Sequence, residues 1–159
     1  MAIGRSSTAL GSLRFSDCVK ITDASPLRNC HLLTRLNCSH CLGLDLRSLR
    51  NCTSLQCLTA SGCSQLRQLS GFIEGLGGLN TLDVSGCKVL SDVSGLANCP
   101  LLHTLMLCGC PQVVDVQCLA SCPELHTLRI IGAEQLTNIS RFAGWLFDGD
   151  RTYVYLSVF

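Results

Sequence analysis

Leucines recur along the chain at a nearly constant interval, and each lies in a short stretch where apolar and polar residues alternate. The central leucines of these stretches are Leu13, Leu36, Leu58, Leu82, Leu105 and Leu128, separated by 23, 22, 24, 23 and 23 residues. Alternation with a period of two is typical of a β-strand with one buried face. The pattern therefore predicts six short strands in six repeats that start near residues 10, 33, 55, 79, 102 and 125.

The residues between the strands predict how each repeat connects to the next. About a dozen residues remain for each return path, which suffices for a turn and a 3₁₀ segment or one short helix. Because every repeat returns to the same place, successive strands are expected to be parallel and stacked about 4.8 Å apart. The sequence therefore predicts an α/β solenoid with a parallel sheet on one face and short 3₁₀, helical or extended returns on the other.

The repeat decays toward the C-terminus. Residues 152–159 still alternate, which predicts a degenerate terminal strand in a single domain that spans residues 1–159. The residues before the first repeat are too few for a good cap, and an uncovered solenoid end favours contact with another chain. We therefore expect some self-association through uncapped ends.

Thirteen cysteines raise the question of a metal site, because thiolates at short spacing are typical zinc ligands. Within the repeat frame, however, most of them form two columns, with Cys18, Cys41, Cys63, Cys87 and Cys110 at the ninth position and Cys30, Cys52, Cys99 and Cys122 at the end of the return. A tetrahedral cluster would have to draw ligands from both sides of the sheet. We therefore expect buried thiols, few or no disulfides, no metal and no cofactor.

The repeat template resembles the leucine-rich repeat family. Its core is L-x-x-L-x-L-x-x-C, and clear copies are "LNTLDVSGCKVLSDVSGLANCP" and "LHTLMLCGCPQVVDVQCLASCP". The closing "CP" is similar to the cysteine-containing repeats of F-box proteins, whereas the short period and the "DVSGL" return resemble internalins and, above all, kinetoplastid leucine-rich repeat proteins. The resemblance implies a right-handed horseshoe with the sheet on its concave face, and a module that binds other proteins without catalysis.

Composition narrows the function further. The net charge is +1 and charged residues make up 14% of the chain, so no nucleic-acid partner is predicted. The sequence contains no long apolar run and no secretory signal, which predicts no membrane partner and a cytoplasmic or nuclear protein. No cysteine, histidine and carboxylate converge in the repeat frame, and no phosphate-binding glycine loop is present, so we expect no enzyme.

The outward strand positions form the surface where a protein partner would bind. Serine and threonine fill much of it, whereas Arg and Met are enriched at interface cores. The candidate binding residues are Arg14, Arg35, Asn37, Thr59, Asp83, Thr104, Met106, Cys108, Arg129 and Ile131. Cys108 is off-consensus, because four other repeats carry serine there. Two alternatives remain open: the substrate-recognition part of a ubiquitin ligase complex, and a surface or secreted repeat antigen of a parasite.

Two smaller patterns concern the returns and the strand starts. Asp23, Asp92 and Asp115, with Gln68 and Asn138 at equivalent places, are expected to accept backbone N–H bonds where each return begins. His103 and His126 occupy equivalent positions in adjacent repeats, so their rings are expected to stack within about 5 Å.

Overall fold

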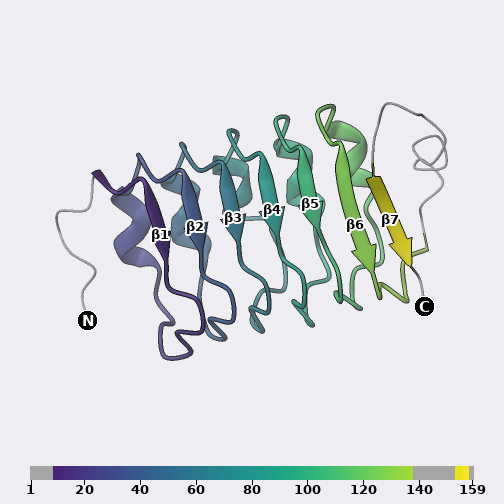
Figure 1. Ribbon diagram of the computed structural model, residues 1–159, viewed down its shortest axis with the longest axis horizontal. Helices are drawn as coiled ribbons and strands as arrows, with labels where there is room; N and C mark the ends of the chain where they lie inside the picture. The colour runs from purple at the N-terminus through teal and green to yellow at the C-terminus, as the bar shows by residue number, and fades with distance from the viewer. Residues whose placement is uncertain (1–8, 138–152, 158–159) are drawn as a thin grey trace.

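A computed structural model describes residues 9–137 and the backbone of residues 153–157. Its main feature is one seven-stranded parallel sheet in which the strands lie side by side in chain order (Figure 1). The strands are β1 (Ser12–Arg14), β2 (Arg35–Asn37), β3 (Cys57–Thr59), β4 (Thr81–Asp83), β5 (Thr104–Met106), β6 (Thr127–Ile131) and β7 (Tyr153–Ser157). The solenoid expected from the leucine period is confirmed.

The strand register matches the columns that the repeat frame predicts. Leu13, Leu36, Leu58, Leu82 and Leu105 each pair with the equivalent leucine of the next strand. The sixth strand continues the series, because Leu128 pairs with Val154 of β7. β7 lies within the segment where alternation predicts a terminal strand; residues 152, 158 and 159 of that segment lie outside the described residues.

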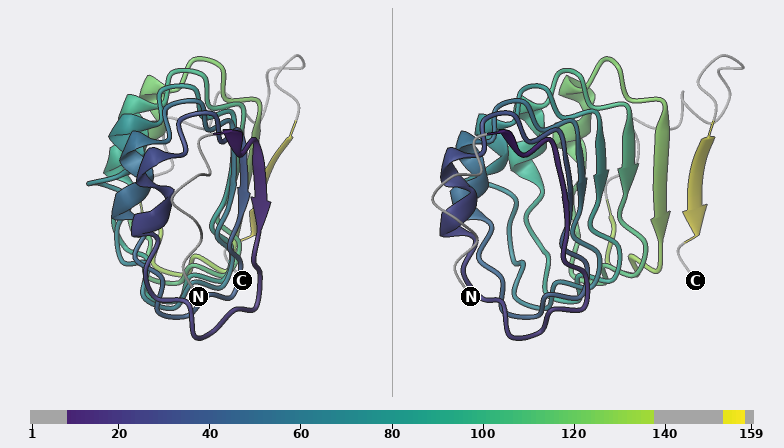
Figure 2. Two further views of the ribbon diagram at one scale, coloured as in Figure 1. Left: turned by 90° about the vertical axis from the view of Figure 1, so that its left-hand side faces the viewer. Right: turned by 60° about the vertical axis from the view of Figure 1, so that its left-hand side comes forward.

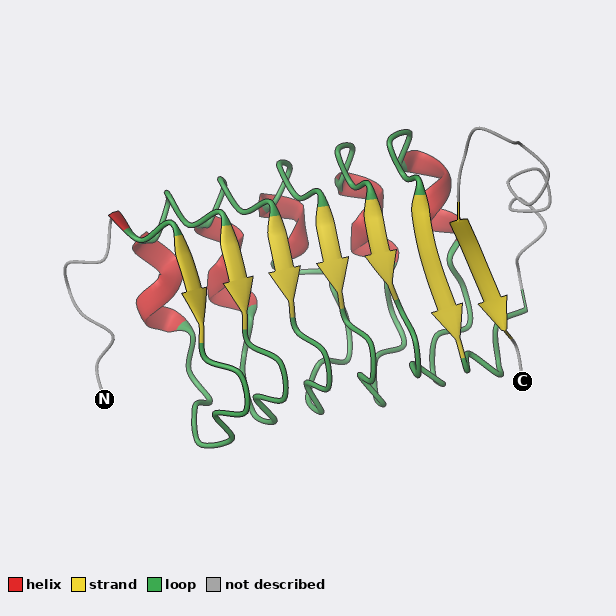
Figure 3. Cartoon of the chain, viewed as in Figure 1, coloured by secondary structure: helices red, strands yellow, loops and turns green. Residues whose placement is uncertain are grey.

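The returns cross the opposite side of the core as short 3₁₀ helices, so sheet and helices form two layers (Figures 2 and 3). These helices are η2 (Ser25–Asn29), η3 (Arg47–Asn51), η4 (Ile73–Gly75), η5 (Ser94–Asn98) and η6 (Gln117–Ser121). Each places a buried apolar residue on the core, such as Leu27, Leu49 or Leu96. A return of this length leaves room for only one or two 3₁₀ turns, as the repeat period predicts.

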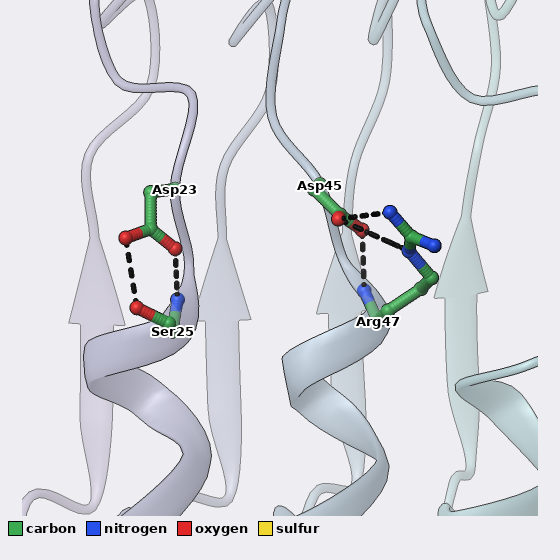
Figure 4. Close-up of polar contacts among 4 residues, drawn as sticks. All are labelled: Asp23, Ser25, Asp45 and Arg47. Atoms are coloured by element: carbon green, nitrogen blue, oxygen red, sulfur yellow. Dashed lines mark hydrogen bonds and ion pairs between the residues drawn. The ribbon is translucent and has the colours of Figure 1, made fainter.

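Aspartates fix the start of most returns. The carboxylates of Asp23, Asp92 and Asp115 accept the backbone N–H of the residue two positions later, at 2.7, 2.8 and 2.7 Å. This confirms the expectation for those three. The expectation is wrong for Gln68, whose side chain accepts no backbone N–H in the described chain, and Asn138 lies outside the described residues. The Asp45 carboxylate accepts the Arg47 N–H in the same way and was not anticipated (Figure 4). The chain therefore begins its 3₁₀ turns with a recurring side-chain cap.

These caps also perturb acidity. The side chain of Ser94 and then its backbone N–H lower the pKa of Asp92 below its usual value of 3.8. At Asp45, the side chain of Arg47 and then its backbone N–H lower the pKa in the same way. A hydrogen bond to the charged form favours ionisation, so each cap is strongest when its carboxylate is deprotonated.

The core consists of stacked leucines with cysteines beside them. At the ninth position, four successive thiols donate to backbone carbonyls of the preceding repeat over 3.2–3.4 Å, namely Cys41 to Phe15, Cys63 to Cys38, Cys87 to Ala60 and Cys110 to Val84. The first member of the column, Cys18, is only half-buried because no described repeat precedes it. We call this column the cysteine ladder; it links each repeat to its neighbour through weak S–H donors.

Candidate functional site

The candidate surface is the outer face of the sheet, which the sequence predicts to be concave. Strand pairing aligns its outward residues in two columns that run along the solenoid. The first column holds Ser12, Arg35, Cys57, Thr81, Thr104 and Thr127, and the second holds Arg14, Asn37, Thr59, Asp83, Met106 and Arg129. We call this surface the sheet face.

Exposure on the sheet face is greatest toward its two ends. Arg14 and Arg35 are exposed near the N-terminal end, and Arg129 is exposed on β6. Thr59 and Thr104, in the middle strands, are half-buried because neighbouring side chains of the columns flank them. The arginine side chains are therefore the parts of this surface that reach farthest toward a partner.

Two of the predicted binding residues hold the chain itself. The side-chain oxygen of Asn37 accepts the Ser39 N–H at 3.1 Å and the Ser16 hydroxyl at 2.8 Å. The carboxylate of Asp83 accepts the Ser85 N–H at 2.9 Å. These bonds fix the turn that follows each strand, so the polar groups of Asn37 and Asp83 are largely committed to the fold.

Apolar and thiol side chains gather near the C-terminal end of the sheet face. Met106 pairs with Arg129 across β5 and β6, and it is half-buried. Cys108 and Ile131 are also half-buried and lie near each other, because the Gly109 N–H donates to the Ile131 carbonyl at 2.6 Å. This group combines a basic residue with adaptable, partly accessible apolar surface.

The cysteines lie in the described part of the chain, and all thirteen are free thiols there. Within those residues, no group of three or more His, Cys, Asp or Glu side chains converges as a metal site. Burial raises the pKa of Cys87, Cys99 and Cys118 to about 12 and that of Cys52 to about 11. These thiols are therefore protonated and weakly nucleophilic at neutral pH.

The histidine pair has the predicted geometry. The rings of His103 and His126 stack with their centroids 4.5 Å apart and their planes 11° from parallel. The Nδ1 of His126 bonds the backbone carbonyl of Glu124, which fixes the orientation of the ring. The pair extends the regular stacking of the repeats to the edge where the strands begin.

The sequence interpretation missed a basic recess among the 3₁₀ helices. This recess has a volume of about 360 Å³ and is lined by Arg28, Arg47, Ser48, Arg50, Asn51 and Gly71. A signal was present, because "LRNC" occurs at the same position in two consecutive repeats.

Comparison with known proteins rests on structure. No protein-family model matches the sequence, and no curated protein matches it. The chain is similar to an internalin (inlF) from Listeria monocytogenes, with 28% identity and a TM-score of 0.64 over 78% of this chain and 42% of that one. It is also similar in fold to the functional domain of InlJ from the same organism, which includes a cysteine ladder, with 19% identity and a TM-score of 0.52.

The InlJ match covers 84% of this chain and 32% of that one, so the chain spans less than half the length of either protein. Among the described residues, none of the helices is long and apolar enough to span a bilayer. The parallel sheet, the short 3₁₀ returns and the internalin neighbours agree with the expectation from the repeat template. The chain is a leucine-rich repeat solenoid, and in its fold it is similar to internalins.

Proposed function

We propose that this solenoid is a non-catalytic module that binds a protein partner on its sheet face. The observation that carries the proposal is the alignment of outward residues into two unbroken columns, with exposed arginines toward both ends. Within the described chain, no element packs over this face (Figure 2). A rigid surface of this kind suits an extended interface, because little conformational entropy is lost on binding.

The residues of the sheet face have different parts in this proposal. Arg14 and Arg35 would contact acidic groups of the partner near the N-terminal end, where both side chains are exposed. Thr59 and Thr104 are short, half-buried side chains in the middle of the sheet face, so a partner can approach the strands closely there. Asn37 and Asp83 shape the surface through the turns that they hold.

The C-terminal end would supply the apolar part of the interface. Met106, Cys108 and Ile131 are half-buried beside Arg129. Methionine and arginine are enriched at interfaces, where methionine adapts to the partner and arginine donates several hydrogen bonds. Contacts at both ends of the sheet face would fix the orientation of the bound partner along it.

Charge reversal tests this proposal. The purified chain is used as bait in extracts of its cell of origin, and partners retained by the wild type are compared with those retained by Arg35→Glu and by Arg129→Glu. Each reversal is expected to reduce capture at least about fivefold with little change in melting temperature, because the side chains are exposed. Arg67→Glu makes the same change of charge at an exposed residue of the return that follows β3, outside the sheet face. Equal loss of capture by this control would refute the sheet face as the binding surface.

We also propose that the module works in a reducing compartment. In the cysteine ladder, thiols donate hydrogen bonds to backbone carbonyls, and a disulfide would remove the hydrogen atom that each bond needs. Alkylation of freshly isolated protein followed by mass spectrometry is expected to modify all thirteen cysteines after denaturation without reductant. A secreted or surface array with oxidised cysteines would leave some of them unmodified.

A further inference from the structure

A second binding site is suggested by the basic recess on the face opposite the sheet, which we call the helix face. The recess lies between η2, η3 and the loop before η4, which come from three consecutive repeats. Figure 3 shows these 3₁₀ helices side by side behind the strands. The core separates the recess from the sheet face, so one partner segment could bind here while the sheet face is occupied.

The charges of the recess are only partly neutralised by the chain. Arg47 forms an ion pair with Asp45 at 2.8 Å (Figure 4). Arg28 and Arg50 are exposed, and neither has an acidic partner within 4 Å in the described chain. The hydrogen bonds from the backbone and side chain of Ser25 are the main reason that the pKa of Asp23 is lowered, and the charge of Arg28 lowers it to a smaller extent.

The next residue of this column forms no ion pair with the two arginines. Glu74 follows Arg28 and Arg50 at the equivalent position of the third return. Its carboxylate accepts the Gly71 N–H at 2.8 and 3.1 Å, so it is engaged with its own loop. Two guanidinium groups in the same position of adjacent repeats repel each other, and an anion between them would relieve that repulsion.

The donors of the recess suit carboxylates. Guanidinium groups bind carboxylates in a bidentate manner, and Ser48 and Asn51 add uncharged donors to the same lining. The carbonyl of Asn51 is bonded to the ring of His31 at 3.0 Å, which anchors this side of the recess. From this geometry we infer that the recess binds an acidic segment of a protein partner.

The surroundings favour an acidic peptide over nucleic acid or a membrane. The positive part of the column ends after two repeats, since the following positions hold Glu74, Ala97 and Ala120. Nucleic acids and anionic bilayers are bound by wider basic surfaces that contact many phosphates. A recess of about 360 Å³ accommodates a few side chains of one peptide.

Fluorescence anisotropy tests this inference, with a fluorescein-labelled peptide of six consecutive glutamates between Gly-Ser flanks as the probe at low ionic strength. The Arg28→Glu/Arg50→Glu variant is expected to bind at least about tenfold more weakly than the wild type. The control is Lys20→Glu/Lys88→Glu, which makes the same change of net charge at two exposed turns outside the recess and outside the two columns of the sheet face, and it is expected to stay within about threefold of the wild type. Melting temperatures verify folding, and Arg28→Gln/Arg50→Gln provides a milder second variant.

Three outcomes would overturn the inference: no binding of the peptide to the wild type, equal loss in the turn-lysine control, or tighter binding of a DNA duplex or phosphatidylserine vesicles through the same arginines. The test is independent of the proposed function. Loss of peptide binding in the Arg28/Arg50 variants with normal partner capture would separate the two faces, and failure of the capture experiment leaves this measurement intact.

Discussion

The cysteine ladder offers the most direct test of how the repeats are held together. Cys87 lies in the middle of the described solenoid, its side chain is 0% exposed, and its thiol donates to the Ala60 carbonyl at 3.3 Å. Replacing it by alanine removes a buried sulfur atom and the only side-chain donor that this carbonyl has in the described chain. Both losses fall at the junction between two repeats, where a solenoid derives much of its stability.

The expected cost follows from these two losses. Loss of a buried group of this size, with the small cavity left behind, costs about 1–2 kcal/mol. Loss of a weak hydrogen bond to a buried carbonyl adds about 0.5–1 kcal/mol. We therefore expect Cys87→Ala to lower the free energy of unfolding by about 1.5–3 kcal/mol. Cys87→Ser is expected to cost less, because its hydroxyl, although smaller than the thiol, can still donate to the carbonyl.

Urea unfolding followed by circular dichroism, with reductant present, measures these differences. The matched control is Cys57→Ala on the sheet face, where the side chain is half-buried, and its expected cost is below about 0.5 kcal/mol. A Cys87→Ala variant as stable as this control would refute a packing role for the ladder. A serine variant no better than the alanine variant would refute the hydrogen-bond part of the argument.

Three other measurements address the returns and the thiols. Gly75→Ala is expected to destabilise the fold by about 1–3 kcal/mol, because the new methyl group would lie 2.0 Å from the Arg50 carbonyl oxygen. The methyl group of Gly77→Ala would meet nothing within 4 Å, so this variant is expected to unfold in urea as the wild type does. Because the pKa of Asp92 is lowered from 3.8, its ionised carboxylate stabilises the fold above pH 3.8, and this stabilisation is lost as the pH falls through the lowered pKa. In unfolding curves, the stability advantage of the wild type over Asp92→Asn should therefore shrink as the pH is lowered below 3.8. Iodoacetamide is expected to label Cys108 before the buried ladder cysteines, as peptide mapping at timed intervals would reveal.

The fold could be predicted because one physical constraint repeats six times. Leu58 and Leu82 must each be buried, and strands that carry such residues at one period can bury them together only by stacking in parallel. The ladder position of Cys87 and Cys110 follows from the same frame, since both fall at the same distance from the strand leucine. Periodicity thus specifies which residues share a column and which columns face the core.

The details of individual returns could not be predicted in the same way. The interval from Leu58 to Leu82 is 24 residues, against 22 before it and 23 after it, but the sequence does not say where the chain absorbs the difference. In the structure, η4 is only three residues long, and Gly75 approaches the backbone of the preceding return. Such a close approach depends on how two particular returns pack against each other. A repeat template records only the residue types that the repeats share, so it does not contain this information.

The same limit applies to the candidate binding residues, and it suggests how to sort them. Sequence alone places Asn37 and Asp83 on the sheet face beside Arg35, but it does not reveal that their oxygens hold the following turns. A residue that the fold already uses should cost stability when it is replaced, whereas an exposed residue without such bonds should cost mainly binding. Asn37→Ala is therefore expected to lower the melting temperature, and Arg28→Ala is expected to leave it unchanged. An exposed arginine such as Arg28, which forms no ion pair in the described chain, is therefore the side chain to test for a ligand.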